Sequence, residues 1–153
     1  MRSLDDAGGQ IGLADLRGQP GAYLLIVRLD RLLDLELSGR SCSLDAGTYA
    51  YCGSARGPGG LAARLARHLR PEKKAHWHID RLTAAGRIAA VYARPGGSEC
   101  ALFEILHRLP ETRTPLPGFG SSDCRRCPAH LVEVPTGFEA PSLAGLIRIE
   151  HES

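Results

Sequence analysis

An arginine and a histidine, four residues apart, are the side chains in this sequence best placed to do chemistry. Leu61, Leu65 and Leu69 recur every four residues, which puts them on one stripe of a helix. At about 100° per residue, Arg64 and His68 lie along the same stripe. An arginine on an inward face is costly to desolvate unless it pairs with a carboxylate or lines a site. The spacing therefore indicates either a snorkelling arginine with a buried acidic partner or a site that binds an anion such as phosphate.

Positive charge is concentrated around this helix. Residues 56–81 hold seven basic and two acidic residues, a formal charge of +5 in a chain whose total is +2. The same segment holds the only tryptophan and three of the six histidines. A local basic patch with an aromatic residue is typical of proteins that bind a phosphate backbone, although a solvated helical face has the same composition. The glycines at 57, 59 and 60 could also leave free N–H groups at the start of the helix as a phosphate seat. We predict that Arg67 and Arg70 lie on the polar face and that nucleic acid contacts Arg67, Arg70, Lys73, Lys74 and His76.

A second possible site lies near the C-terminus. Cys124, Cys127 and His130 are spaced like zinc ligands, and a distant residue such as Cys100 would have to supply a fourth. The alternative is a group of reduced thiols packed near the last strand. The chain has an odd number of cysteines, five, and its start lacks the pattern of a secretory signal. We therefore expect a cytoplasmic protein with reduced thiols and, because no apolar run is long enough, no membrane-spanning helix.

The periodicities around these residues predict an α+β fold, with a small antiparallel β-sheet flanked by helices. The predicted strands are residues 22–27, 32–37, 48–52, 88–92 and 131–134. The predicted helices are residues 61–69, 76–84 and 98–108, the last with Ser98 as its N-cap. The length of 153 residues suits one domain, which we place at residues 21–135, between a loosely packed arm at 1–20 and a tail at 136–153.

Several short motifs, in order, resemble the GIY-YIG nuclease superfamily. Residues 21–23 (Gly-Ala-Tyr) resemble its first signature triplet, and residues 51–53 (Tyr-Cys-Gly) resemble the second. Residues 61–68 resemble the helix that carries the family's arginine, here Arg64, and Glu99 matches the metal-binding glutamate. The resemblance covers roughly residues 20–134, and it extends to a Uri-type branch through residues 53–61, 73–80 and 118–124.

The resemblance implies a metal-dependent endonuclease that hydrolyses phosphodiester bonds of nucleic acid, with DNA as the expected substrate. It implies that Glu99 holds Mg²⁺ (or Mn²⁺), that Tyr23 and Tyr51 act on the attacking water, and that Arg64 contacts the scissile phosphate. His68, which we expect to open into the site, could relay a proton. Without the resemblance, the two tyrosines would be ordinary sheet aromatics and Glu99 a first-turn acid that complements the helix dipole, with Glu104 as the fallback ligand.

Two features depart from the family pattern. Tyr51 follows Tyr23 by 28 residues, a longer gap than is typical, and the sequence contains no asparagine to complete the site. Two alternatives therefore stay open: a nucleic-acid-binding module of the same fold with weak catalysis, and a zinc-stabilised interaction domain.

Overall fold

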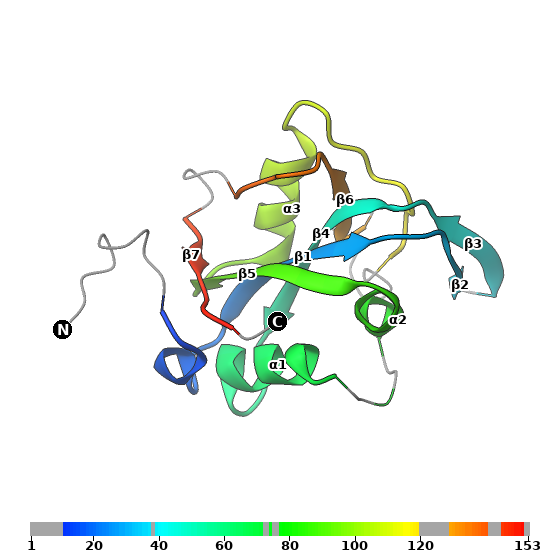
Figure 1. Cartoon of the computed structure of the whole chain (residues 1–153). Coiled ribbons are helices and arrows are strands. Elements are labelled where there is room, and N and C mark those ends of the chain that lie inside the picture. Colours follow the sequence, from blue (N-terminus) through cyan, green and yellow to red (C-terminus); the bar gives the residue numbers. More distant parts are fainter. Residues whose placement is uncertain are drawn as a thin grey trace.

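A five-stranded antiparallel sheet forms the centre of the molecule, in a computed structural model that describes residues 11–37, 39–71, 74, 77–119, 129–140 and 145–151 (Figure 1). The strand order is β6-β4-β1-β5-β7, and each neighbouring pair is antiparallel. The predicted fold class is thus confirmed. The strands are β1 (Gly21–Leu29), β4 (Gly47–Ala55), β5 (Arg87–Pro95), β6 (Leu131–Val134) and β7 (Ile147–Arg148).

The two faces of the sheet are covered by different helices. Helices α1 (Gly60–Leu69) and α2 (His78–Ala85) lie on one side, and α3 (Glu99–His107) lies on the other (Figure 1). Ser98 caps α3 as predicted, because its Oγ accepts a hydrogen bond from the Ala101 N–H. Helix α2 begins two residues later than predicted, directly after Trp77.

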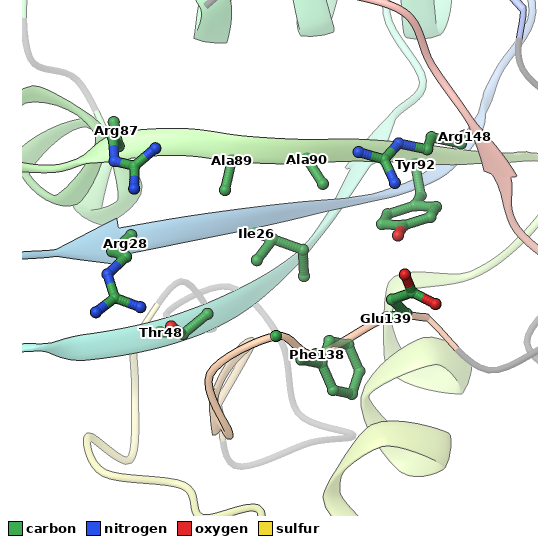
Figure 2. Close-up of a pocket in the computed structure, with 11 residues that line it drawn as sticks. Ile26, Arg28, Thr48, Arg87, Ala89, Ala90, Tyr92, Phe138, Glu139 and Arg148 are labelled. Atoms are coloured by element: carbon green, nitrogen blue, oxygen red, sulfur yellow. The ribbon is translucent and has the colours of Figure 1, made fainter.

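Strand alternation sorts the core residues between these faces. Tyr23, Tyr51, Leu61 and Leu65 belong to the core cluster on the α1 and α2 side. On the α3 side the strands contribute small and aliphatic residues, among them Ala22, Leu24, Ile26, Ala50 and Cys52. Helix α3 leaves one end of this second face open, where the segment at Phe138 lies opposite the strands (Figure 2).

The long gap between the two tyrosines is occupied by a separate ribbon. Strands β2 (Leu33–Leu37) and β3 (Arg40–Leu44) pair with each other in a two-stranded sheet. The strand predicted at residues 32–37 corresponds to β2 and had been expected in the same sheet as β1 and β4, whereas β3 had not been predicted. Because the ribbon lies beyond that sheet (Figure 1), β1 and β4 still pair directly, with Tyr23 opposite Gly53 and Tyr51 opposite Leu25. The extra residues therefore leave the two tyrosines on the same face of adjacent strands.

The segments outside the predicted domain also pack onto it. Within the expected arm, the short helix η2 (Leu13–Leu16) contacts α1, and Leu16 is buried in the core on that side. The expected loose packing therefore does not hold at Leu16, whereas residues 17–20 are exposed. Near the C-terminus, β7 extends the sheet and Ile149 is buried. Within the described residues, no helix is long and apolar enough to cross a membrane.

Candidate active site on the tyrosine face

A buried hydrogen bond between Tyr23 and His68 forms the centre of the candidate site. The Tyr23 hydroxyl lies 2.7 Å from His68 Nε2, and each residue is 1% exposed. The Tyr23 ring lies over Gly53 on the neighbouring strand, where any Cβ atom would overlap it. The expectation that His68 opens into a cleft is wrong. Its position on the inward stripe of α1 buries the imidazole, which reaches the Tyr23 hydroxyl instead.

Tyr51 completes an aromatic cluster with these two rings. Its ring centroid lies 6.3 Å from that of Tyr23 and 6.4 Å from that of His68. Phe119 packs against Tyr51 edge-on, at 6.2 Å between centroids. Burial raises the pKa of both tyrosines well above the usual range, and the positive charge of Arg64 opposes only part of that rise. Both side chains are therefore neutral phenols at neutral pH.

Arg64 lies beside this cluster, half-buried, as its place on the apolar stripe predicted. It donates a hydrogen bond to the Ser54 carbonyl oxygen at 3.0 Å, and its guanidinium carbon lies 4.4 Å from the centroid of the Trp77 ring. Within the described residues, Arg64 makes no ion pair. The alternative of a snorkelling arginine paired with a buried carboxylate is therefore not observed for Arg64 in this part of the chain.

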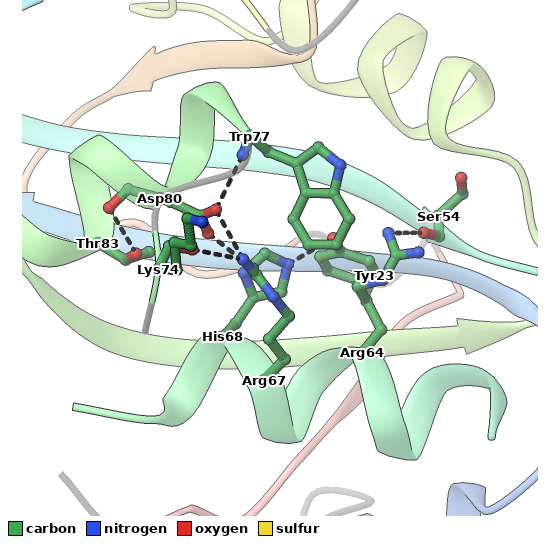
Figure 3. Close-up of polar contacts among 9 residues, drawn as sticks. All are labelled: Tyr23, Ser54, Arg64, Arg67, His68, Lys74, Trp77, Asp80 and Thr83. Carbon is green, nitrogen blue, oxygen red and sulfur yellow. Dashed lines mark hydrogen bonds and ion pairs between the residues drawn. The ribbon is translucent and has the colours of Figure 1, made fainter. Parts of the chain in front are cut away.

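The buried carboxylate of this region, that of Asp80, pairs with the next arginine of α1, Arg67 (Figure 3). Arg67 donates two hydrogen bonds to Asp80, at 2.8 and 3.0 Å, and Asp80 is 2% exposed. Asp80 also accepts the Trp77 backbone N–H, which caps α2. The Arg67 guanidinium carbon lies 4.2 Å from the Trp77 ring centroid, so both arginines stack on this one indole. The prediction that Arg67 lies on the polar face is therefore wrong.

Trp77 and Asp80 are the residues that the sequence reasoning missed. Trp77 was noted only as part of a basic segment, and Asp80 was not named as a candidate. The available signal was the position of Asp80, three residues after Trp77, where a carboxylate can accept a helix-capping N–H. Their contact with Arg67 spans 13 residues and could not be read from local spacing.

Glu99 is the first residue of α3 and is half-buried. Its negative charge contributes to raising the pKa values of Tyr23 and Tyr51, so the carboxylate lies within electrostatic reach of both phenols. Within the described residues it makes no ion pair. In that same part of the chain, no group of three or more His, Cys, Asp or Glu side chains could hold a metal ion. Glu104, the fallback ligand, pairs instead with Arg108 on the surface of α3.

The remaining basic residues are only partly described. Arg70 and Lys74 are exposed, whereas Lys73 and His76 lie outside the described residues. The proposed phosphate seat at the start of α1 needs correction, because two of its donors are already used. The Gly60 N–H binds the Gly57 carbonyl, and the Leu61 N–H binds the Gln19 carbonyl.

One contact bears on the zinc prediction. Cys100 Sγ lies 3.9 Å from His130 Nε2, both in the buried part of the molecule. Two of the four residues considered as ligands therefore lie together, although they are 30 residues apart in sequence. Cys124 and Cys127 lie outside the described residues.

The tyrosine face thus combines a buried phenol–imidazole pair and an arginine without a carboxylate partner in the described part of the chain. Glu99, at the start of α3 on the other side of the sheet, lies within electrostatic reach of the two phenols. No curated protein and no solved structure matches the chain. Residues 22–146 match the family described as "Domain of unknown function DUF123". This match spans most of the 153 residues and includes Tyr23, Tyr51, Arg64, His68 and Glu99, and the chain therefore belongs to the DUF123 family.

Proposed function

We propose that the chain is a metal-dependent endonuclease that hydrolyses phosphodiester bonds of nucleic acid, with DNA as its expected substrate. The observation that carries the proposal is the 2.7 Å contact between Tyr23 and His68 beside the half-buried Arg64. Burial of these titratable side chains carries a desolvation cost, and groups whose pKa values are strongly shifted by burial and by a nearby charge cluster at functional sites.

In this proposal a water enters beside the half-buried Arg64 to reach the Tyr23 hydroxyl, which is buried in the free chain. Tyr23 then positions this attacking water and passes on its proton. Because its pKa is raised, Tyr23 does not serve as a preformed phenolate. As a neutral phenol it accepts a hydrogen bond from water while donating its own proton toward His68 Nε2. As the water oxygen bonds to phosphorus, its proton moves to Tyr23 and the phenol proton moves to His68. The bond from phosphorus to the leaving oxygen breaks, and that oxygen takes up a proton from solvent.

Arg64 would bind the scissile phosphate. A guanidinium can hold two phosphate oxygens at once, and its charge offsets the negative charge that develops on them. The Ser54 carbonyl and the Trp77 ring fix the side chain before substrate arrives, which lowers the cost of ordering it on binding.

Glu99 fits the role of a magnesium ligand. A hard cation prefers oxygen, keeps several waters and often uses only one or two carboxylates, which suits a single half-buried carboxylate. A cation bound there would add positive charge near the scissile phosphate. A cytoplasmic location belongs to the same proposal, and it agrees with the free thiols of Cys42, Cys52 and Cys100.

The direct test is incubation with branched, nicked and single-stranded DNA, and with single-stranded RNA, in Mg²⁺ or Mn²⁺. Arg64→Ala and Tyr23→Phe should each lower kcat by about 10²–10³-fold and change the affinity for DNA far less, because both groups act on the transition state. Arg31→Ala is the matched control, since Arg31 is exposed and outside the site. Absence of cleavage by the wild-type chain would contradict the endonuclease and leave the weakly catalytic binding module. Cleavage by Arg64→Ala at the wild-type rate would contradict the assigned site.

A zinc-stabilised interaction domain is a second candidate, favoured by the Cys100–His130 contact. It would require Cys124 and Cys127 as the other ligands. Metal analysis of the purified chain decides between the two: one zinc per chain, lost in Cys100→Ser, supports this candidate. A zinc-free chain that stays folded in a chelator contradicts it.

A further inference from the structure

A hollow on the other face of the sheet carries three arginines that the candidate active site does not use. Its volume is about 300 Å³, and it lies where α3 leaves the strands uncovered (Figure 2). Ile26 and Ala90 form its floor, and the segment at Gly137–Glu139 forms its opposite wall. Its charged lining residues are Arg28, Arg87, Arg148 and Glu139.

A β-bulge brings two of these arginines together. The register between β1 and β5 shifts after Ile26, so that Ala89 is an extra residue in β5. With regular alternation Arg87 would point to the tyrosine face, whereas beyond the bulge it points into the hollow, directly opposite Arg28. The same shift turns Ile88 toward the other core, so the bulge also has a packing role.

Two like charges directly opposite each other on adjacent strands repel. Arg28 has only a loose contact with exposed Asp30, at 3.7 Å, and Arg87 makes no ion pair within the described residues. An anion placed between the two guanidinium groups would turn this repulsion into attraction. Arginine is also the side chain that best matches the geometry of phosphate.

The third arginine lies further along the hollow. Arg148 on β7 is opposite Tyr92, and its guanidinium carbon lies 6.0 Å from the Tyr92 ring centroid. Arg87 and Tyr92 are five positions apart in β5, a span of about 15 Å at the usual strand rise. A single phosphate cannot reach both ends. Phe138 lies between these two ends and is half-buried, so the exposed part of its ring suits the flat face of a nucleic-acid base (Figure 2). Tyr92 is only 8% exposed and contributes its ring to the wall beside Arg148.

We propose that this hollow, lined by Arg28, Arg87, Tyr92, Phe138 and Arg148, binds a single-stranded segment of nucleic acid. The segment would place one phosphate between Arg28 and Arg87 and a later one at Arg148. Glu139 at the rim is the one opposing charge among the lining residues, and it lowers the attraction without cancelling three arginines. The inference rests on the proposed binding of nucleic acid and does not require cleavage.

The test is a salt titration of binding, with the full chain, a fluorescent oligothymidylate of about 12 nucleotides and EDTA to exclude cleavage. The double variant Arg28→Ala/Arg87→Ala should weaken binding about tenfold or more at low salt. It should also lower the slope of log K against log salt by about 0.7 for each phosphate contact removed. Arg148→Ala should lower the slope by a similar step. The control Arg31→Ala/Arg40→Ala removes the same charge from exposed positions outside the hollow and should leave the slope nearly unchanged.

Equal slopes for the double variant and its control would overturn the proposal. The proposal would also be overturned if thymidine monophosphate competed for binding as well as the oligonucleotide does, because the hollow would then be a small-molecule site. If the double variant does not fold, the single Arg87→Ala change, at an exposed position, gives the same test. If the hollow variants lower the salt slope and the wild-type chain cleaves nothing, the result would support this inference while contradicting the endonuclease. If the wild-type chain cleaves DNA but the hollow variants keep the salt slope of the control, the result would support the endonuclease and contradict this inference.

Discussion

The two faces of the central sheet are built from the same strands but bury different chemistry. On the α1 and α2 face, two tyrosines, a histidine, a tryptophan and an aspartate are wholly or partly buried, and hydrogen bonds and stacked rings hold them. Beneath α3 the buried residues are mostly small and aliphatic, with Phe103 and Tyr92 as the aromatic members and His130 beside Cys100. Buried polar groups are costly and specific, whereas apolar packing is cheaper and more tolerant. The α1 and α2 face therefore buries the polar groups of the candidate active site within its core. Beneath α3 the core serves mainly packing, and the charged groups of that side, Glu99 and the arginines of the hollow, lie at its edges.

The two arginines stacked on Trp77 also differ in what they bind. Arg67 is bound by the buried carboxylate of Asp80. Within the described residues, Arg64 meets a backbone carbonyl, the Tyr23 side chain and the same indole, but no carboxylate. One arginine therefore maintains the architecture, and the other keeps its charge available for a ligand.

The largest effect should come from the apolar core, and it should separate the two faces. Leu65→Ala and Leu106→Ala remove equally buried leucines, one in α1 and one near the end of α3, about two turns from Glu99, and each should cost about 2–5 kcal/mol of unfolding free energy. Only Leu65→Ala should also lower cleavage per folded molecule, since Leu65 adjoins Arg64. Urea unfolding and cleavage assays on both variants provide the measurement. A large loss of cleavage in Leu106→Ala would break the comparison.

Removal of the buried carboxylate should come next. Asp80→Ala leaves Arg67 without its partner and α2 without its cap, and should cost about 2–3 kcal/mol. The fluorescence of Trp77, the only tryptophan, should change at the same time. Glu104→Ala is the control, because it removes an exposed pair with Arg108 and should cost less than about 1 kcal/mol. Equal costs for the two variants would show that Asp80 is not a structural anchor.

A smaller effect is expected from Gly53. In Gly53→Ala the new methyl group overlaps the Tyr23 ring, which must shift, at a cost of about 1–3 kcal/mol and with loss of the contact with His68. Gly47→Ala on the same strand meets only ordinary contacts, the nearest at 3.6 Å from its new Cβ, and should be close to neutral. Thermal unfolding of both variants checks the difference. A neutral Gly53→Ala would mean that Tyr23 is not confined as described.

The smallest effect should be seen with pH. Burial raises the pKa of Tyr49 to about 12, and it raises the pKa values of Tyr23 and Tyr51 as well. A tyrosine whose pKa is higher in the folded chain stabilises the fold below its unfolded value near 10. That contribution is lost as the pH rises toward the folded value. Urea midpoints should therefore be steady from pH 7 to 9 with respect to these groups and fall above about pH 10. The fall should be shallower in Tyr49→Phe, and an identical fall in that variant would refute the assignment to Tyr49.

Local pattern alone was enough to predict much of this molecule. Apolar runs and four-residue spacing predicted the strands around Tyr23 and Tyr51 and the helix that carries Arg64, because side-chain periodicity directly reflects which face is buried. The same periodicity identified Arg64 as an inward-facing arginine before any fold was known. The capping role of Ser98 was local as well, and it was confirmed.

Tertiary structure decided which of these residues meet. His68 is buried because Tyr23, 45 residues earlier, supplies its hydrogen-bond partner. Arg67 turns inward because it binds Asp80 on another helix. The ribbon of β2 and β3 leaves the main sheet, and a one-residue bulge sends Arg87 to the face of Arg28. Each outcome depends on a partner distant in sequence or on the register between two strands. Distant partners and strand register do not produce a periodic pattern of residues in the sequence. Periodicity specifies which side of an element is buried, but only packing specifies what it is buried against.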